Sequence, residues 1–166
     1  SHELFHQWFG DLVTAESWAN LTLNESFADY SEYMWYDYRD GKDLGDAYRY
    51  KATQKYIRSS KFKNEPIVNY YYDRPHDNFD DIRYEKGGAV LHMLRNYVGE
   101  DAFFKSLNKY LTNFKFNSAE ISDLRKVFEE ITGEDLNWFF TQWWMSKGHP
   151  VLDITHKYDE NNKTIE

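Results

Sequence analysis

The sequence predicts a mainly α-helical fold with a short β segment at its C-terminal end. Apolar residues recur at three- and four-residue steps through most of the 166 residues. Phe, Tyr and Trp make up 19% of the chain, which is enough to fill a core between helices. From Val151 onward apolar and polar residues alternate instead, which is typical of a strand. We therefore expect a helical body in residues 1–149 and the start of a following β domain in residues 150–166.

The first expected helix begins at the N-terminal end and carries two histidines. His2 and His6 are four residues apart and share one helix face, while Glu3 lies about 100° round the axis. Two imidazoles with one glutamate form a known catalytic zinc set. Glu25 is the natural third ligand, because the chain between His6 and Glu25 is long enough to turn and bring back a second helix. Glu3 is then free to act as general base on a water molecule that the metal activates.

Two long helices are expected after a short loop. Residues 8–18 contain a glycine and a Glu-Ser pair and are expected to form the loop. The second helix should run from Leu21 to Tyr38, and Gly41 suits a left-handed cap at its end. Its apolar face should carry Phe27, Tyr30, Met34 and Tyr38. A third helix should run from Asp43 to Ser59. Its buried side should carry Leu44, Ala47, Tyr48 and Tyr56.

The rest of the helical body is expected to be a long loop and four more helices. Residues 66–81 contain two prolines and three consecutive tyrosines, and long loops of this kind often belong to a site. Helical periods return over residues 80–99, 100–114, 120–133 and 134–147. Gly87 and Gly88 allow a neighbouring backbone to approach closely. Residues 117–120 resemble a capping box. The last helix carries Trp138, Trp143 and Trp144, which are expected to lie in the core.

Asp29 follows Glu25 by four residues and therefore faces the same way. Its carboxylate could accept the second ring N–H of a zinc-binding histidine. A solvated carboxylate on the helix surface is at least as good an interpretation. The other histidines lack ligand spacing and are expected to be surface or packing residues. They are His76, His92, His149 and His156.

Composition excludes several classes of partner. The net charge is −8, from 28 acidic and 20 basic residues, so a nucleic acid is not expected to bind. There is no cysteine, and therefore no disulfide or thiolate chemistry. No apolar run approaches the roughly 18 residues of a membrane span, so none is expected in this chain. The cellular compartment stays open.

Three motifs in order resemble the gluzincin aminopeptidases of the aminopeptidase N type. They are His-Glu-x-x-His, followed after eighteen residues by the glutamate of Leu-Asn-Glu-Ser-Phe-Ala; HQWFGDLVT from His6; and YEKGGAVLHMLR from Tyr84. Together they are far more specific than a lone HExxH. The resemblance extends to about Pro150. It departs at Thr22 and Ser26, where the family has Trp and Gly, and this affects local packing rather than ligand chemistry.

The resemblance implies the C-terminal helical half of a thermolysin-like metallopeptidase domain, with zinc as its cofactor. It implies that the parent enzyme removes N-terminal residues from peptide substrates. It also implies that Tyr84 donates its hydroxyl to the oxyanion, since a phenol with a pKa near 10 stays protonated at neutral pH. The family's preceding β-rich segment, which binds the substrate's amino group, is not in this sequence. We therefore expect a piece of a longer enzyme that lacks its N-terminal and C-terminal domains.

Two other functions are compatible with the same residues. A dual-function relative that hydrolyses epoxides would share the zinc ligands, and a scaffold module could keep the fold without catalysis. Intact His2, Glu3, His6, Glu25 and Tyr84 argue against the scaffold. For the 166-residue piece alone, we expect folding, weak zinc binding and no aminopeptidase activity, because the metal helix begins at a chain end and the amine-binding loop is missing.

Overall fold

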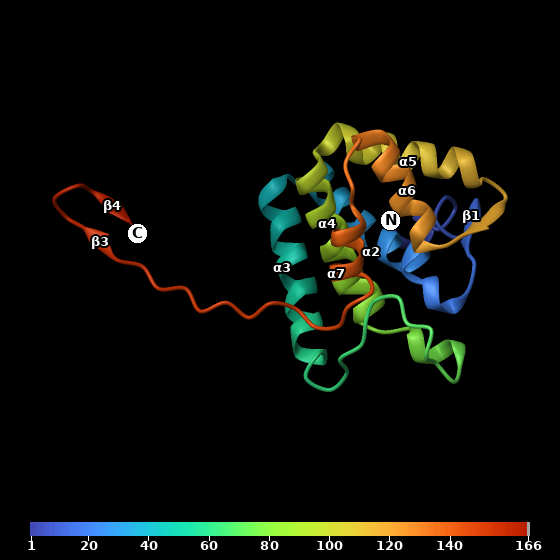
Figure 1. The fold of residues 1–166 in the computed structure, drawn as a ribbon, viewed down its shortest axis with the longest axis horizontal. Coiled ribbons are helices and arrows are strands. Elements are labelled where there is room, and N and C mark those ends of the chain that lie inside the picture. The colour runs from blue at the N-terminus through green and yellow to red at the C-terminus, as the bar shows by residue number, and fades with distance from the viewer. Residues whose placement is uncertain (166) are drawn as a thin grey trace.

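The computed structural model describes residues 1–165 and confirms the mainly α-helical prediction (Figure 1). The α-helices are α1 (His2–Phe5), α2 (Thr22–Asp40), α3 (Lys42–Ser59), α4 (Gly87–Val98), α5 (Glu100–Phe114), α6 (Ile121–Thr132) and α7 (Asn137–Trp143). A π-helical turn (Ile82–Lys86) precedes α4, and short 3₁₀ helices lie at Trp18–Asn20 and Pro75–Asn78. The strands are β1 (Val13–Ala15), β2 (Asn117–Ala119), β3 (Tyr158–Asp159) and β4 (Thr164–Ile165).

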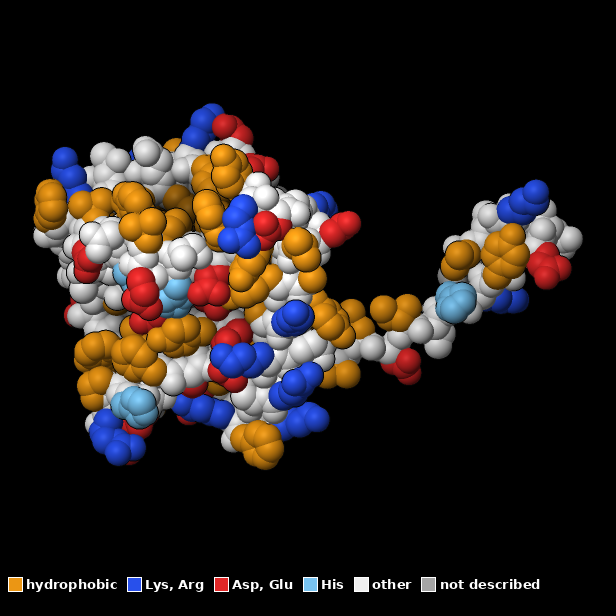
Figure 2. Space-filling model, turned by 180° about the vertical axis from the view of Figure 1, so that it is seen from behind, with side chains coloured by type: hydrophobic (Ala, Val, Ile, Leu, Met, Phe, Trp, Pro, Cys, Tyr) orange, Lys and Arg blue, Asp and Glu red, His pale blue; other side chains and the backbone are white. Residues whose placement is uncertain are grey.

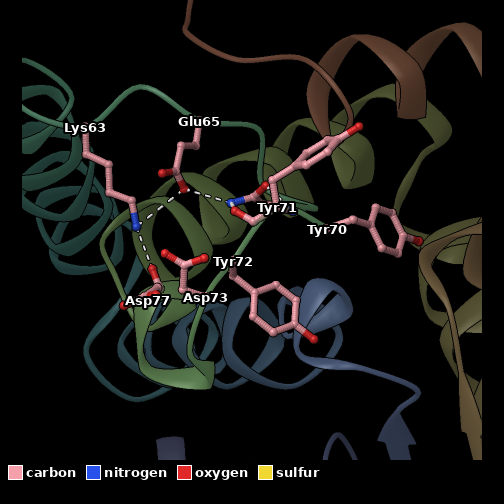
Figure 3. Close-up of a pocket in the computed structure, with 8 residues that line it drawn as sticks. Lys63, Glu65, Tyr70, Tyr71, Tyr72, Asp73 and Asp77 are labelled. Carbon is pink, nitrogen blue, oxygen red and sulfur yellow. Dashed lines mark hydrogen bonds and ion pairs between the residues drawn. The ribbon is translucent and has the colours of Figure 1, made fainter.

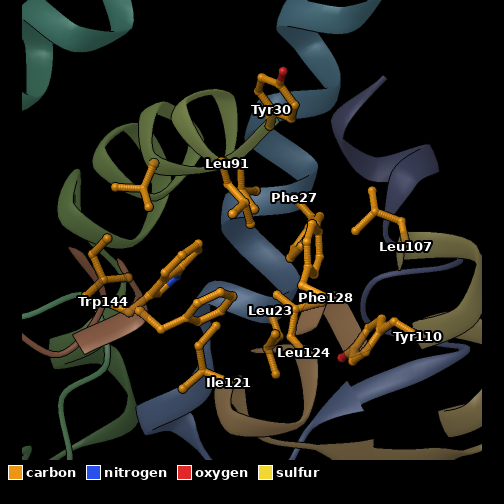
Figure 4. Close-up of a cluster of buried hydrophobic side chains, with 14 of the residues drawn as sticks. Leu23, Phe27, Tyr30, Leu91, Leu107, Tyr110, Ile121, Leu124, Phe128 and Trp144 are labelled. Carbon is orange, nitrogen blue, oxygen red and sulfur yellow. The ribbon is translucent and has the colours of Figure 1, made fainter. Parts of the chain in front are cut away.

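Helix α2 is the centre of the body. It packs against α1, α3, α4 and the π-helical turn. Its inner face carries Leu23, Phe27 and Tyr30, which are at most 2% exposed (Figure 4). Leu91 from α4 and Phe128 from α6 close the same core. Each large apolar side chain buried in this way contributes about 1.5–3 kcal/mol, so α2 is fixed rigidly among its neighbours.

A small parallel sheet ties the N-terminal segment to the start of α6. Strand β1 pairs with β2, with Val13 opposite Asn117 and Ala15 opposite Ala119. The side-chain oxygen of Asn20 accepts the backbone N–H of Ile121 at 3.0 Å. Residues 8–18 were expected to be a loop, so this sheet is a correction. Strands of three residues are too short to show an alternating pattern in the sequence, and these two strands are about a hundred residues apart.

Helix α3 buries only part of the face that its apolar residues predicted. Tyr56 is buried and Tyr48 is half-buried, as predicted, but Leu44 and Ala47 are exposed and Gly45 is buried instead. A Cβ on Gly45 would lie 3.0 Å from the Cα of Asp37, so α2 and α3 meet closely at this glycine. The closest approach of two helices needs a small residue rather than an apolar one, and this decides which face of α3 is covered.

The ends of α6 and α7 also differ from the predictions. The capping box lies at Glu120 and Asp123 rather than over residues 117–120, where the chain is strand β2. Helix α7 begins at Asn137, because the side chain of Asp135 accepts the backbone N–H of Asn137 and ends the preceding turn there. Only part of the tryptophan prediction holds: Trp144 is 1% exposed, but Trp138 is 49% exposed.

The C-terminal segment lies apart from the helical body (Figure 1). Residues 151–157 are exposed and are not part of a strand, which corrects the strand expected from Val151. An antiparallel pair begins only at Tyr158, which lies opposite Ile165. A strand needs a pairing partner, and within residues 1–165 the 151–157 segment has none. The division into residues 1–149 and a following β domain stays a prediction.

No helix in residues 1–165 is long and apolar enough to cross a membrane.

Candidate metal centre

Helices α1 and α2 bring His2, His6 and Glu25 together. The Nε2 atoms of His2 and His6 lie 3.4 and 3.5 Å from Oε2 of Glu25. Within residues 1–165 these three form the one group of His, Cys, Asp or Glu ligand atoms, all within 4.8 Å of one another, that could hold a metal ion. Zn–N and Zn–O bonds of about 2.0–2.1 Å in a tetrahedron place neighbouring ligand atoms about 3.4 Å apart. The spacing of these side chains therefore fits zinc.

Stacked aromatic rings hold α1 against α2 at this position. Phe9 stacks on Phe27 of α2 with ring centroids 4.2 Å apart and planes 5° apart. Phe5 of α1 stacks on Phe9 at 5.2 Å. The carbonyl of Ser1 accepts the N–H of Phe5 at 2.9 Å, so the first helical turn is closed. The aromatic side chains that follow the His-Glu-x-x-His motif thus set the distance between the histidines and α2.

The second ring nitrogen of each histidine also has a neighbour. Nδ1 of His6 lies 3.0 Å from the carbonyl oxygen of Phe9 and donates its hydrogen to it. The lone pair of Nε2 is therefore free to bind a metal ion. Nδ1 of His2 lies 3.5 Å from Oε1 of Glu32. Glu32, and not Asp29, is therefore the carboxylate beside His2.

Asp29 is turned toward α4 instead. Its Oδ2 would lie 2.6 Å from a Cβ on Gly88. Burial first, and then the charges of Glu85 and Glu32, raise the pKa of Asp29 to about 7. The expectation that Asp29 accepts a hydrogen bond from a zinc-binding histidine is therefore corrected. Asp29 is a half-buried carboxyl group that packs on Gly88.

Tyr84 lies on the π-helical turn and faces the histidines. Its ring is stacked on that of His2, with centroids 6.0 Å apart and planes 6° apart. Burial first, and then the charge of Glu25 and a hydrogen bond to it, raise the pKa of Tyr84 above its ordinary value. The phenol therefore stays protonated and can donate a hydrogen bond. The charge of Glu3 also raises this pKa, and the Glu3 side chain is exposed outside the ligand group.

Figure 2 shows, on the face opposite that of Figure 1, histidine side chains flanked by acidic ones, with hydrophobic side chains gathered on either side. Apolar side chains line a groove between α1 and α2. They include Leu4, Trp8, Met34, Trp35 and Tyr38. The acidic and histidine side chains thus reach the surface of the molecule between apolar walls.

Comparison with known proteins confirms the family resemblance over most of the chain. Residues 1–143 match the peptidase family M1 domain. The chain belongs to peptidase family M1. It is 35% identical to aminopeptidase M1-D of Oryza sativa subsp. japonica over 160 residues, covering 95% of this chain and 18% of that protein. It is 36% identical to the tricorn protease-interacting factor F2 of Thermoplasma volcanium, covering 93% of this chain and 20% of that protein.

Solved M1 structures share the fold. The M1 zinc metallopeptidase of Deinococcus radiodurans superimposes with a TM-score of 0.75 at 30% identity, over 91% of this chain and 33% of that one. Yeast LTA4 hydrolase, solved with bestatin, gives a TM-score of 0.80 at 23% identity, over 92% of this chain and 26% of that one, which shows the fold alone. This M1 chain spans about a fifth of the length of the curated relatives it matches.

The two departures from the family motif are accommodated by a buried chain of hydroxyl groups. Trp144, directly after α7, donates its Nε1–H to Oγ1 of Thr22 at 3.1 Å, and Thr22 is hydrogen-bonded to Ser26 at 2.6 Å. Ser26 donates to the carbonyl oxygen of Arg83 at 2.6 Å. A Cβ on Gly87 would lie 1.9 Å from Oγ of Ser26, so the glycine makes room for the serine. In this M1 chain the hydroxyl chain joins α2 and the residue that follows α7 to the turn that carries Tyr84.

The long loop is anchored by buried charge. Arg83 is 0% exposed and donates to Asp80 at 2.7 Å and to Glu65 at 3.1 Å. The loop forms an open pocket of about 660 Å³, in which Lys63 pairs with Glu65 and donates to the carbonyl of Asp77 (Figure 3). The three candidate ligands do not line this pocket. Its charged groups largely pair with one another. Because Arg83 belongs to the π-helical turn and donates to Glu65, these ion pairs hold the loop against that turn.

Sequence reasoning missed Glu32 and Arg83, and it placed Tyr48 on the buried side of α3 without giving it a partner. Glu32 follows Glu25 by seven residues, two turns along the same helix face, and that spacing could have identified it. Tyr48 and its partner Glu32 lie on different helices, and Arg83 reaches Glu65 across the fold, so no local pattern indicates these two contacts.

Proposed function

We propose that this chain carries the zinc centre of an aminopeptidase, in which His2, His6 and Glu25 are the protein ligands. The observation that carries the proposal is the convergence of both Nε2 atoms on Oε2 of Glu25, at the edge length of a zinc tetrahedron. When bound there, zinc would polarise the scissile carbonyl and lower the pKa of water to about 7.

The chain's own side chains supply the other chemical roles. Glu3, which lies outside the ligand group, takes the proton of the attacking water and passes it to the leaving amine. Tyr84 donates its phenol hydrogen to the oxyanion that develops on the carbonyl oxygen. The raised pKa of Tyr84 supports this role, because a phenol that keeps its proton remains a donor across the physiological range.

Peptides with a free N-terminus are the proposed substrates. The relatives named aminopeptidases support this choice, and a mutant form of the Deinococcus enzyme was solved with a Tyr-Ser-Ala substrate. We also propose that residues 1–149 act within an enzyme of the relatives' length, since the matched relatives are about five times longer.

Hydrolysis by an enzyme of that length that contains residues 1–166 tests the proposal. An aminoacyl p-nitroanilide should be cleaved, its N-acetylated form should not be cleaved, and Glu3→Gln should abolish turnover without loss of zinc. Zinc binding without hydrolysis of any free-amine substrate would favour the scaffold. Hydrolysis of an epoxide with no peptide cleavage would favour the epoxide hydrolase.

A further inference from the structure

Glu32 joins His2 to a helix that has no other part in the metal centre. One carboxylate oxygen of Glu32, Oε1, lies 3.5 Å from Nδ1 of His2. The other oxygen, Oε2, accepts a short hydrogen bond from the hydroxyl of Tyr48 on α3. The carboxylate thus lies between the ring of a candidate ligand and a tyrosine from a different helix.

Tyr48 is held firmly enough to fix that carboxylate. Its ring is partly buried and stacks on Tyr36 of α2 with centroids 5.1 Å apart. Burial first, and then the hydrogen bond to Glu32, raise the pKa of Tyr48 well above its ordinary value. The hydroxyl therefore remains a donor, and Glu32 is left with Oε1 to accept from His2.

We infer that Tyr48 and Glu32 are positioning residues that select the Nδ1–H tautomer of His2 and aim its Nε2 lone pair toward Glu25. The inference rests on the zinc centre proposed above. The two histidines are supported differently, since Nδ1 of His6 donates to the backbone carbonyl of Phe9. Substitution of Glu32 or Tyr48 should therefore affect His2 and leave His6 unchanged.

The expected loss of zinc affinity follows from the effect that hydrogen-bond partners of metal-binding histidines have in other proteins. Removing a group that orients a metal-binding histidine typically lowers metal affinity by about 10- to 100-fold. Glu32→Ala should show this loss. Glu32→Gln keeps one oxygen that can accept from Nδ1 and should recover part of it, and Tyr48→Phe should lose less than Glu32→Ala because the carboxylate itself remains.

The experiment uses the complete 166-residue chain and has two readouts. Histidine ring ¹⁵N shifts, recorded without metal at a pH where the rings are neutral, report the tautomer of each histidine. Competition with a chromogenic chelator reports zinc affinity. We expect the His2 ring in Glu32→Ala to become a mixture of tautomers with a 10- to 100-fold loss of affinity, while the His6 ring stays unchanged.

Tyr36→Phe is the matched control, because it removes a hydroxyl from the ring that stacks on Tyr48 and leaves the bond to Glu32 in place. It should change neither readout. Tyr48→Phe tests the inference independently if Glu32→Ala does not fold. An unchanged His2 tautomer and an unchanged zinc affinity in the folded variants would overturn the inference. A wild-type chain that binds no zinc would instead refute the proposed function, and the tautomer readout would still decide the role of Glu32 and Tyr48.

Discussion

Replacing Gly87 by alanine should destabilise the fold, and replacing Ser26 by glycine should remove that effect. Gly87 has φ −58° and ψ −47°, so its backbone already suits alanine. The added Cβ, however, would lie 1.9 Å from Oγ and 2.6 Å from Cβ of Ser26. Turning the hydroxyl away relieves only the first contact. The second requires α2 and the π-helical turn to separate by roughly 1 Å.

The expected magnitudes follow from packing and helix propensity. Overpacking of this kind costs about 1–3 kcal/mol, so Gly87→Ala should lower the free energy of unfolding by about 2 kcal/mol. In the Ser26→Gly background the clash is gone, and alanine should instead stabilise the helix by up to about 1 kcal/mol. The coupling free energy between the two positions is therefore about 3 kcal/mol, which is large for a neighbouring pair.

Urea unfolding of the wild type, the two single variants and the double variant measures this coupling. Tryptophan fluorescence and far-ultraviolet circular dichroism should give coincident transitions with equal m-values. Ser26→Gly alone should also be destabilising, because it removes the hydrogen bond to Arg83 and places a glycine inside α2. An equal effect of Gly87→Ala in both backgrounds would refute the close contact between α2 and the turn that carries Tyr84.

Three further predictions concern catalysis, pH and the C-terminal segment. In an active enzyme that contains this chain, Tyr84→Phe should lower kcat by about 10²–10³ with little change in KM; steady-state kinetics with near-normal kcat would make Tyr84 a packing residue. Asp29 has a folded-state pKa of about 7 against an ordinary value of 3.8, so the stability it contributes is complete below pH 4 and is lost as the pH rises through 7. Urea unfolding of the metal-free chain should therefore show Asp29→Asn gaining about 2.5 kcal/mol relative to wild type between pH 5 and pH 8, whereas parallel pH profiles would contradict the raised pKa. Removal of residues 150–166 should leave the thermal midpoint of the helical body unchanged, because residues 151–157 are exposed; a lower midpoint would show that the segment packs on the body.

The sequence was informative where a contact depends on spacing along one helix. Residues 100–114 were predicted as a helix and form α5, because their apolar residues keep one period and a positive-φ glycine precedes them. The separation of His2 and His6 likewise fixes their common face whatever surrounds them. The structure brings both histidines to Glu25, as the motif spacing led us to expect.

The sequence was uninformative where a neighbour from another part of the chain decides the outcome. The buried face of α3 depends on Gly45 meeting α2, and apolar periodicity gives no weight to a glycine. Asp29 and Glu32 both lie on the side of α2 that carries Glu25, so spacing alone could not decide which carboxylate meets His2. The position of Tyr48 on the neighbouring helix α3 decides which carboxylate meets His2, because the Tyr48 hydroxyl donates a hydrogen bond to Glu32.

Zinc titration of three proteins, the wild-type chain, Glu3→Gln and Glu25→Ala, tests the central claim most directly. Glu25 supplies the oxygen on which both histidines converge, whereas Glu3 lies outside the ligand group. Isothermal calorimetry should therefore show one zinc per chain in the wild type, the same affinity in Glu3→Gln, and a loss of binding in Glu25→Ala. Equal loss in both variants, or undiminished binding in Glu25→Ala, would contradict the proposed metal centre.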